Sequence, residues 1–412
     1  MYRSRRKLIA AACGAAALGG CSFSFEHGLL NPCRGESPND PAIEAAVLAA
    51  WEGIDATLVW DCHVHLVGEG DSGSGIWLHP AMRSVMRPLL YAQRLLYRNA
   101  SCSGVEPGPV DDRYVERLQR LIEELPPGAK AVLLALDWHH TEDGEPLPAA
   151  TAIRIPGEYA MSIAARHRGR FEWAASIHPY RRDCIAALRA AKANGACAVK
   201  WLPATMGIDP GSGRCDAFYA EIARLGLPLI THAGTESAVR FGEQQHLGNP
   251  LRLRRPLEHG VRVVVAHCAT LGEDRDLDRG EDGPYVPSFE LFARLMDDAR
   301  YRENLYGDLS AVAQMNRAGR FLKRLLERRD WHARLLNGSD YPLPGVMPIH
   351  SLNLLVQLEV IEPAIAPVLA GIREYNPLLF DFVLKRHLRA GAARFPAGVF
   401  ETRPFFQVSG VS

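Results

Sequence analysis

The residues best suited to chemistry near the start of the chain are His63 and His65, which follow the largely apolar run 57–60. On a β-strand, side chains two residues apart point to the same side, so both imidazoles would project together while Cys62 and Val64 face the other way. Paired imidazoles are common ligands of zinc and related divalent metals. A solvent-exposed strand face could also carry two histidines, so the pair alone leaves both interpretations open.

Residues that could bind a metal or a substrate recur where later apolar, strand-like runs end. Scattered surface histidines would not be expected to fall at so many of these ends. His178 and His139 are candidates for substrate contact, although a packing role fits them equally well. The set comprises His139 after 131–136, His178 after 171–177, Lys200 within 196–201, His232 after 228–231, His267 after 261–266, Asp308 within 304–309 and Asp340 after 335–337.

Strand and helix patterns alternate along most of the chain. Counting the run 57–65, there are eight strand-like runs with helical runs between them. This predicts an α/β protein with a (β/α)8 TIM barrel over 46–395, followed by a C-terminal tail at 396–412. The segment 66–110 would form a long insertion or lid after strand 1. Because the active site of such a barrel lies at the carboxyl ends of its strands, the residues above are expected to converge.

The composition limits the classes of ligand. The 412 residues carry a formal net charge of +0, with 47% hydrophobic and 23% charged residues. The chain has no excess of basic residues that would indicate nucleic-acid binding, so a small-molecule substrate is expected. Assembly into a homo-oligomer remains open.

The N-terminus resembles an export signal. Four basic residues within 3–7 precede an apolar run at 8–20 that is too short to span a bilayer. The sequence at 18–21 resembles a lipoprotein lipobox, and 4–8 resembles a twin-arginine signal. We therefore expect a signal peptide at 1–21, lipidation of Cys21 and a tether at 22–45. This predicts a lipoprotein of the bacterial cell envelope, facing the periplasm and touching the membrane through its lipid anchor only.

Cysteine usage is only loosely informative. Without Cys13 and Cys21, seven of the nine cysteines remain, which is an odd number and implies no framework of bridges. Cys33 and Cys102 lie in irregular segments and are candidates for a single disulfide.

The ordered motifs resemble the metal-dependent amidohydrolase superfamily, in particular the amidohydrolase-2 branch that contains aminocarboxymuconate semialdehyde decarboxylase. The resemblance covers about 57–390 and implies that His63, His65, His232 and Asp340 bind a divalent metal such as zinc. It implies that His267 either binds a second metal or contacts the substrate and the attacking water. The motifs are His63-x-His65, Lys200 in 198–203, His232 in 230–234, His267 in 265–268 and Asp340 in 337–342.

Lys200 has three possible roles. The resemblance suggests a carboxylated Lys200 that bridges two metal ions, in which case the site holds two ions. A free ammonium could instead bind a substrate carboxylate or pair with Asp340, and a structural ion pair is the third role.

The expected activity is hydrolysis by a metal-activated water of an ester, lactone or amide in a small, carboxylated substrate. Asp340 would accept the proton of that water, with His267 and Lys200 as further catalytic residues. Two alternatives are a mononuclear decarboxylase of an unsaturated or aromatic acid, and a barrel lipoprotein that binds a ligand or metal without turnover.

Overall fold

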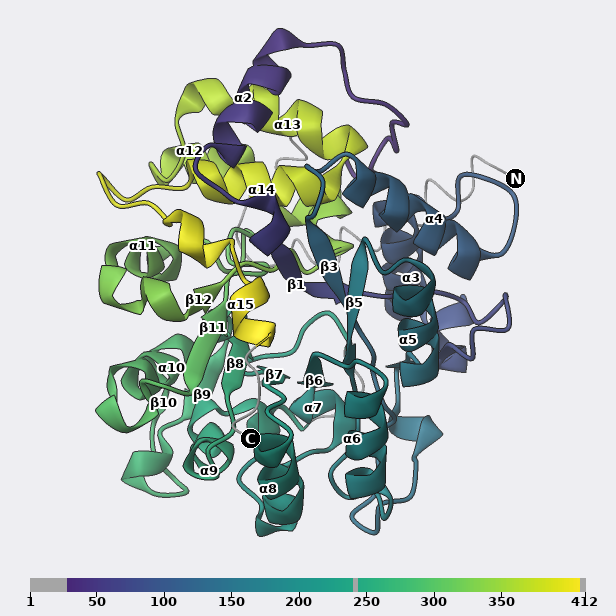
Figure 1. Ribbon diagram of the computed structural model, residues 1–412, viewed down its shortest axis with the longest axis vertical. Helices are drawn as coiled ribbons and strands as arrows, with labels where there is room; N and C mark the ends of the chain where they lie inside the picture. Colours follow the sequence, from purple (N-terminus) through teal and green to yellow (C-terminus); the bar gives the residue numbers. More distant parts are fainter. Residues whose placement is uncertain (1–27, 240–243, 408–412) are drawn as a thin grey trace.

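A computed structural model describes residues 28–239 and 244–407 of the chain. Its centre is a sheet of eight parallel strands in the order β1-β3-β5-β6-β7-β8-β11-β12 (Figure 1). The strands are β1 (Trp60–His65), β3 (Lys130–Leu134), β5 (Phe171–Ala175), β6 (Ala198–Trp201), β7 (Leu229–His232), β8 (Val263–Ala266), β11 (Leu305–Asp308) and β12 (Leu335–Leu336). The predicted TIM barrel and the positions of its eight strands are confirmed.

The last strand meets the first. Cys62 N–H donates to the carbonyl of Asn337 at 3.1 Å, and His65 N–H donates to the carbonyl of Tyr341 at 2.9 Å. These bonds close the barrel between β12 and β1. They also place residues 337–341 directly beside the two histidines of β1.

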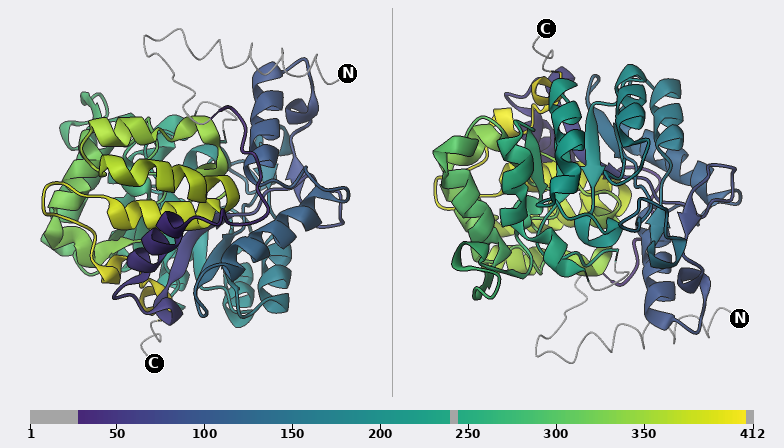
Figure 2. Two further views of the ribbon diagram at one scale, coloured as in Figure 1. Left: turned by 90° about the horizontal axis from the view of Figure 1, so that it is seen from above. Right: turned by 90° about the horizontal axis from the view of Figure 1, so that it is seen from below.

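Helices surround the strands and follow the predicted pattern between them (Figures 1 and 2). Those that follow barrel strands are α4 (Val110–Glu123), α5 (Gly157–Arg166), α6 (Cys184–Ala193), α7 (Pro203–Met206), α8 (Asp216–Arg224), α9 (Arg254–Glu258), α10 (Ser288–Asp297) and α11 (Arg320–Glu327). Additional elements are α2 (Pro41–Trp51), α3 (Pro88–Ala100), α12 (Leu352–Gln357), α13 (Ala366–Tyr375), α14 (Pro377–His387), α15 (Arg403–Phe406), and the short strand pairs β2 (Trp77–Leu78) with β4 (Ile153–Arg154) and β9 (Glu273–Arg275) with β10 (Tyr285–Pro287). Among the described residues no helix combines the length and the apolar character needed to cross a bilayer.

The core has an inner and an outer layer. Alternate strand residues such as Leu134, Ala198 and Ile230 fill the barrel interior, while their neighbours pack against the surrounding helices. Phe406 of α15 joins the inner layer, and its ring stacks on Trp60 with the centroids 5.9 Å apart. The start of the predicted C-terminal tail is therefore part of the barrel's packing.

The predicted tether at 22–45 is wrong for the part that the structure describes. Asn31 is buried, and its N–H donates to the side-chain oxygen of Asn99 in α3 at 2.8 Å. The predicted disulfide between Cys33 and Cys102 is present. Helix α2 begins at Pro41 and lies beside α13 and α14 (Figure 2). The predicted signal peptide and Cys21 lie outside the described residues.

Removing the disulfide should destabilise the protein. The bridge joins residues 69 apart in sequence, and in the chain-entropy account closing such a loop contributes about 2–4 kcal/mol by restricting the unfolded state. Cys33→Ser combined with Cys102→Ser should lower the free energy of unfolding by that amount in denaturant titrations. Reduced wild type should match the double variant. Equal stability of the double variant and oxidised wild type would contradict this expectation.

Candidate metal centre

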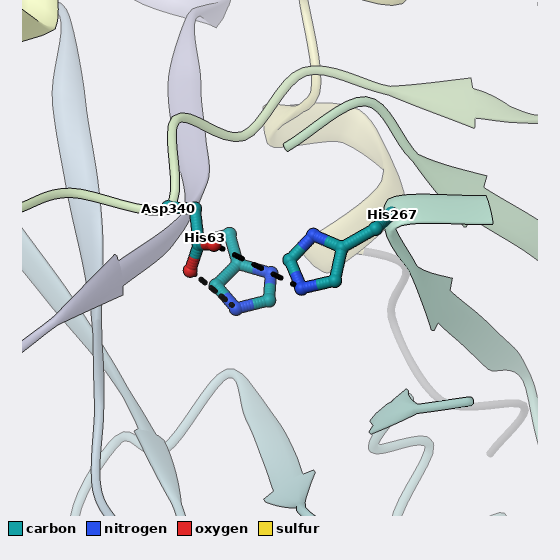
Figure 3. Close-up of side chains that lie close together, drawn as sticks. All are labelled: His63, His267 and Asp340. Atoms are coloured by element: carbon teal, nitrogen blue, oxygen red, sulfur yellow. Dashed lines mark ion pairs between the residues drawn. The ribbon is translucent and has the colours of Figure 1, made fainter. Parts of the chain in front are cut away.

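Four side chains that are distant in sequence converge at the carboxyl end of the barrel. Asp340 Oδ1 lies 3.1 Å from His65 Nε2 and 3.5 Å from His63 Nε2, while Asp340 Oδ2 lies 3.9 Å from His267 Nε2. The two Nε2 atoms of β1 are 3.2 Å apart. Figure 3 shows His63 and His267 on the same side of the Asp340 carboxylate. One ligand atom each from His63, His267 and Asp340 fits within 4.8 Å, a spacing that suits one bound ion.

Asp308 and Ser310 fix which nitrogen of each ring faces this cluster. His63 Nδ1 lies 2.8 Å from Asp308 Oδ2, and His267 Nδ1 lies 3.0 Å from the carbonyl of Ser310. Since carboxylate and carbonyl oxygens only accept, both Nδ1 atoms carry the proton and both Nε2 atoms present a lone pair. The lone pairs of His63 and His267 thus face the oxygens of Asp340. All of these atoms are hydrogen-bond acceptors, and no proton is available to join them. A bound cation would satisfy this arrangement, so the residues present fit a divalent metal.

The backbone of β1 and of the loop after β12 brings these groups together. The pairing of β1 with β3 is irregular between Asp61 and Val64. Because of this irregularity Cys62 belongs to the barrel interior on the same side as His63, whereas simple alternation predicted opposite sides. Gly338 allows the close approach of the two segments, since a Cβ at that position would lie 2.7 Å from the Cβ of His63.

His267 and Asp340 both have left-handed backbone conformations, with φ of +56° and +63°. Such conformations cost a non-glycine residue of order 1–3 kcal/mol. Asp340 is held in place by its N–H, which donates to the carbonyl of His63 at 2.8 Å. The fold therefore keeps two residues in backbone conformations that cost stability, and these conformations direct the two side chains toward the cluster.

Lys200 and His232 line the same pocket as the cluster. Lys200 is fully buried, and its Nζ lies 2.9 Å from His63 Nε2. The His232 ring lies 5.4 Å from the His267 ring, and its Nε2 is 3.5 Å from Glu236 Oε2. The structure thus brings all six predicted metal-site residues to one pocket, and the shortest contact among them joins Lys200 to His63.

Burial controls the protonation of these groups. It lowers the pKa of His63, a shift that the charge of Lys200 reinforces, and it lowers the pKa of His232 to about 4. Burial, followed by Arg317, holds the pKa of His267 well below its usual value. The three rings are therefore neutral near pH 7, as metal ligands must be.

The pKa values of Asp340 and Lys200 are also lowered. Burial opposes ionisation of Asp340, but the hydrogen bond from His65 and the proximity of His63 outweigh it, so the pKa falls and the carboxylate is charged. Burial lowers the pKa of Lys200, which makes its ammonium easier to deprotonate. A neutral amine is the form that carboxylation would require.

The structure places His178 and His139 away from the cluster. His178 is fully buried; its Nε2 donates to the carbonyl of Met206 at 3.0 Å, and its Nδ1 accepts from Tyr180 N–H at 3.2 Å. His139 lies 3.0 Å from the carbonyl of Thr205 and lines a separate polar hollow. Both rings already have backbone partners, so packing explains them better than the expected substrate contact.

Several residues of the site carried no recognisable sequence signal. Ser310, Glu236, Gln314 and Arg317 lie in loops after the strands, where no fixed spacing marks them. Asp308 stood at a strand end, but its role as the partner of His63 depends on a contact across 245 residues.

A second, apolar pocket adjoins the cluster and shares His65 and Asp340 with it. Its walls include Met82, Leu90 and Tyr97 from the insertion after β1. Tyr97 O–H donates to the carbonyl of Ala238 at 2.6 Å, which ties α3 to the loop after β7. The insertion therefore forms one wall of the space through which a substrate would reach the cluster.

Several solved structures show similarity to this chain. Among solved structures, the chain is similar to an uncharacterised TIM-barrel protein from Bordetella bronchiseptica, at 15% identity and TM-score 0.45 over 77% of this chain and 94% of that one. It is also similar to a probable 2-pyrone-4,6-dicarboxylic acid hydrolase from Acinetobacter baumannii, at 14% identity and TM-score 0.40 over 77% and 91%. A third similar structure is 5-carboxyvanillate decarboxylase from Sphingomonas paucimobilis, at 12% identity and TM-score 0.41 over 76% and 97%.

No functionally curated protein matches the chain. A family profile described as Amidohydrolase matches residues 60–378, which contain the whole cluster. The chain belongs to the amidohydrolase family.

Proposed function

We propose that this protein is a metal-dependent hydrolase that cleaves the C–O or C–N bond of an ester, lactone or amide in a small carboxylated substrate. The observation that carries the proposal is the meeting of the His63 and His267 lone pairs with the Asp340 carboxylate. A divalent cation held there, such as zinc, would polarise a substrate carbonyl and make water more acidic. A second ion would require carboxylation of Lys200.

Three residues of the chain have the remaining roles in the proposed reaction. The carboxylate oxygens of Asp340 lie 3.1–3.9 Å from the Nε2 atoms of His65, His63 and His267 and its pKa is lowered, so it accepts the proton of the attacking water and returns it to the leaving group. His267 faces the same space and positions the substrate carbonyl. Asp308, whose pKa is lowered by His63 and Ser310 despite burial, keeps His63 oriented.

A second candidate is a mononuclear decarboxylase of an unsaturated or aromatic acid. It is favoured by the single group of three converging ligand residues in the described part of the chain, because one such group suits one ion. In this alternative, Lys200 is not carboxylated and its amine lies beside His63.

We also propose that the protein works in the bacterial cell envelope, attached through a lipid on Cys21. The Cys33–Cys102 disulfide supports this location, because such bridges persist in oxidising compartments.

Turnover in water enriched in ¹⁸O separates the two reactions. The metal-loaded protein is incubated with panels of carboxylated lactones, esters and amides and of unsaturated and aromatic acids. Incorporation of one ¹⁸O into the product carboxylate supports hydrolysis. Release of CO2 with a solvent proton in the product supports decarboxylation. Absence of both reactions in protein with bound metal would contradict the proposal.

A further inference from the structure

Arg317 is a buried cation without an ionic partner among the residues that the structure describes. It lies in the loop between β11 and α11, is 6% exposed and lines the pocket above the cluster. Its Nη1 donates to Thr270 Oγ1 at 3.4 Å, and its Nε has no hydrogen-bond partner in the described part of the chain. Within residues 28–239 and 244–407, no carboxylate oxygen lies within the 4.0 Å of an ion pair.

Gln314 supplies a second donor without an acceptor. It is 5% exposed, lines the same pocket, and its Nε2 has no hydrogen-bond partner within 28–239 and 244–407. Arg317 N–H donates to the carbonyl of Gln314 at 2.8 Å, so a single turn holds both side chains. Among the described residues, the pocket that contains the metal ligands therefore also carries two unsatisfied donor groups, one of them cationic.

Leaving such groups buried is costly. An ionised group removed from water requires a partner of opposite charge, and an unpaired buried donor loses its hydrogen bond to water. Burial accordingly lowers the pKa of Arg317, although Asp340 and Glu236 act from a distance in the other direction. The ligand that best compensates is a planar anion with two acceptor oxygens, since a guanidinium binds a carboxylate through two parallel N–H groups.

Lys200 is less suited to this role. Its Nζ already lies 2.9 Å from His63 Nε2, inside the metal cluster. The adjoining pocket is lined mainly by apolar side chains such as Val67, Met82 and Leu90, and its charged lining residue is Asp340, which it shares with the cluster. A substrate can thus place an anionic group on Arg317 and an apolar body in the adjoining pocket.

We propose that Arg317 and Gln314 form a carboxylate-binding subsite, so that the substrates are carboxylic acids with an apolar, ring-bearing or unsaturated body. This inference rests on the proposed function, because the metal ligands supply the second anchor that brings the reacting bond to Asp340. Arg317 is then the residue that determines specificity for acids over neutral analogues.

The test is direct binding of benzoate, with benzamide as its neutral counterpart, by calorimetry on metal-free and metal-loaded protein. Wild type should bind benzoate at least about 30-fold more tightly than benzamide, and Arg317→Met should lose most of that preference, because hydrogen bonds to a charged partner carry such factors. Gln314→Leu should weaken benzoate binding about 5-fold. Arg320→Met, an exposed site at the start of α11, should change it less than 2-fold.

Stability of the ligand-free protein distinguishes a ligand-binding from a structural arginine. Arg117 is equally buried but donates to the carbonyls of Tyr375 and Arg34. Arg117→Met should therefore lower Tm, whereas Arg317→Met should leave it unchanged or raise it, because it removes an uncompensated charge. A fall in Tm for Arg317→Met as large as for Arg117→Met would overturn the inference.

The remaining outcomes also separate this inference from the proposed function. Equal binding of benzoate and benzamide by wild type, absence of binding at millimolar concentrations, or unchanged preference in Arg317→Met would overturn the subsite. Retained, Arg317-dependent benzoate binding in a protein that turns over no substrate and holds no metal would leave the subsite standing and contradict the hydrolase.

Discussion

Asp340→Asn is expected to lower kcat/KM by about 10³- to 10⁴-fold, the range associated with loss of a general base in a preorganised site. The substitution keeps the size of the side chain but removes the charge that faces three imidazoles at 3.1–3.9 Å. It also leaves one fewer anionic ligand, so metal affinity should fall together with turnover. Steady-state kinetics on samples with measured metal content separate the two effects.

Asp274→Asn is the matched control for that variant. Asp274 is also buried, and its Oδ2 accepts from Ser288 Oγ at 2.7 Å, outside the metal pocket. An amide oxygen can accept the same bond, so kcat/KM should stay within about 2-fold of wild type. If fully metal-loaded Asp340→Asn turned over substrate as fast as wild type, Asp340 would be excluded as the proton acceptor.

Asp308→Asn is expected to weaken metal binding by about 10- to 100-fold without touching a ligand atom. The carboxylate accepts from His63 Nδ1 at 2.8 Å through one oxygen and from the N–H groups of His267 and Ser310 at 3.0 Å through the other. An asparagine has a single acceptor oxygen and cannot serve both sides. If its amide group faces His63, the ring must move its proton to Nε2, where the metal would bind.

Chelator competition measures this effect, and the ¹⁵N chemical shifts of the histidine rings report the tautomer. Ser310→Ala is the milder comparison, since Ser310 Oγ lies 3.2 Å from His63 Nδ1 but the Asp308 contact remains. Unchanged affinity and an unchanged tautomer in Asp308→Asn would show that Asp308 does not orient His63.

The sequence predicts those parts of the protein that depend on local, repeating patterns of apolar and polar residues. Each barrel strand is a short apolar run, and the helices between them follow the helical period, so all eight strands are found within a few residues of their predicted positions. The site residues at the strand ends followed from the fold, because a parallel barrel gathers those ends on one face. His63, His65, His267 and Asp340 were found in this way.

The features that were missed depend on contacts between distant segments. Alternation on β1 placed Cys62 opposite His63, but pairing with β3 introduces an irregularity that no single-strand pattern reveals. The segment after residue 28 has the composition of a linker, yet the contact between Asn31 and Asn99 and the disulfide at Cys33 fix it to α3. Arg317 and Gln314 lie in a loop without periodicity, so only the fold shows that both enter the pocket.

The metal content per chain tests the central claim most directly. Protein that begins at residue 22, without the predicted signal peptide and Cys21, and that is purified without chelator in bicarbonate buffer should contain at least about one divalent ion per chain by elemental analysis. His63→Ala and Asp340→Asn should lower that content, and loss of a second ion in Lys200→Met would identify a carboxylated Lys200. Wild-type protein that holds no metal and cannot be reconstituted with zinc or another divalent ion would contradict the account.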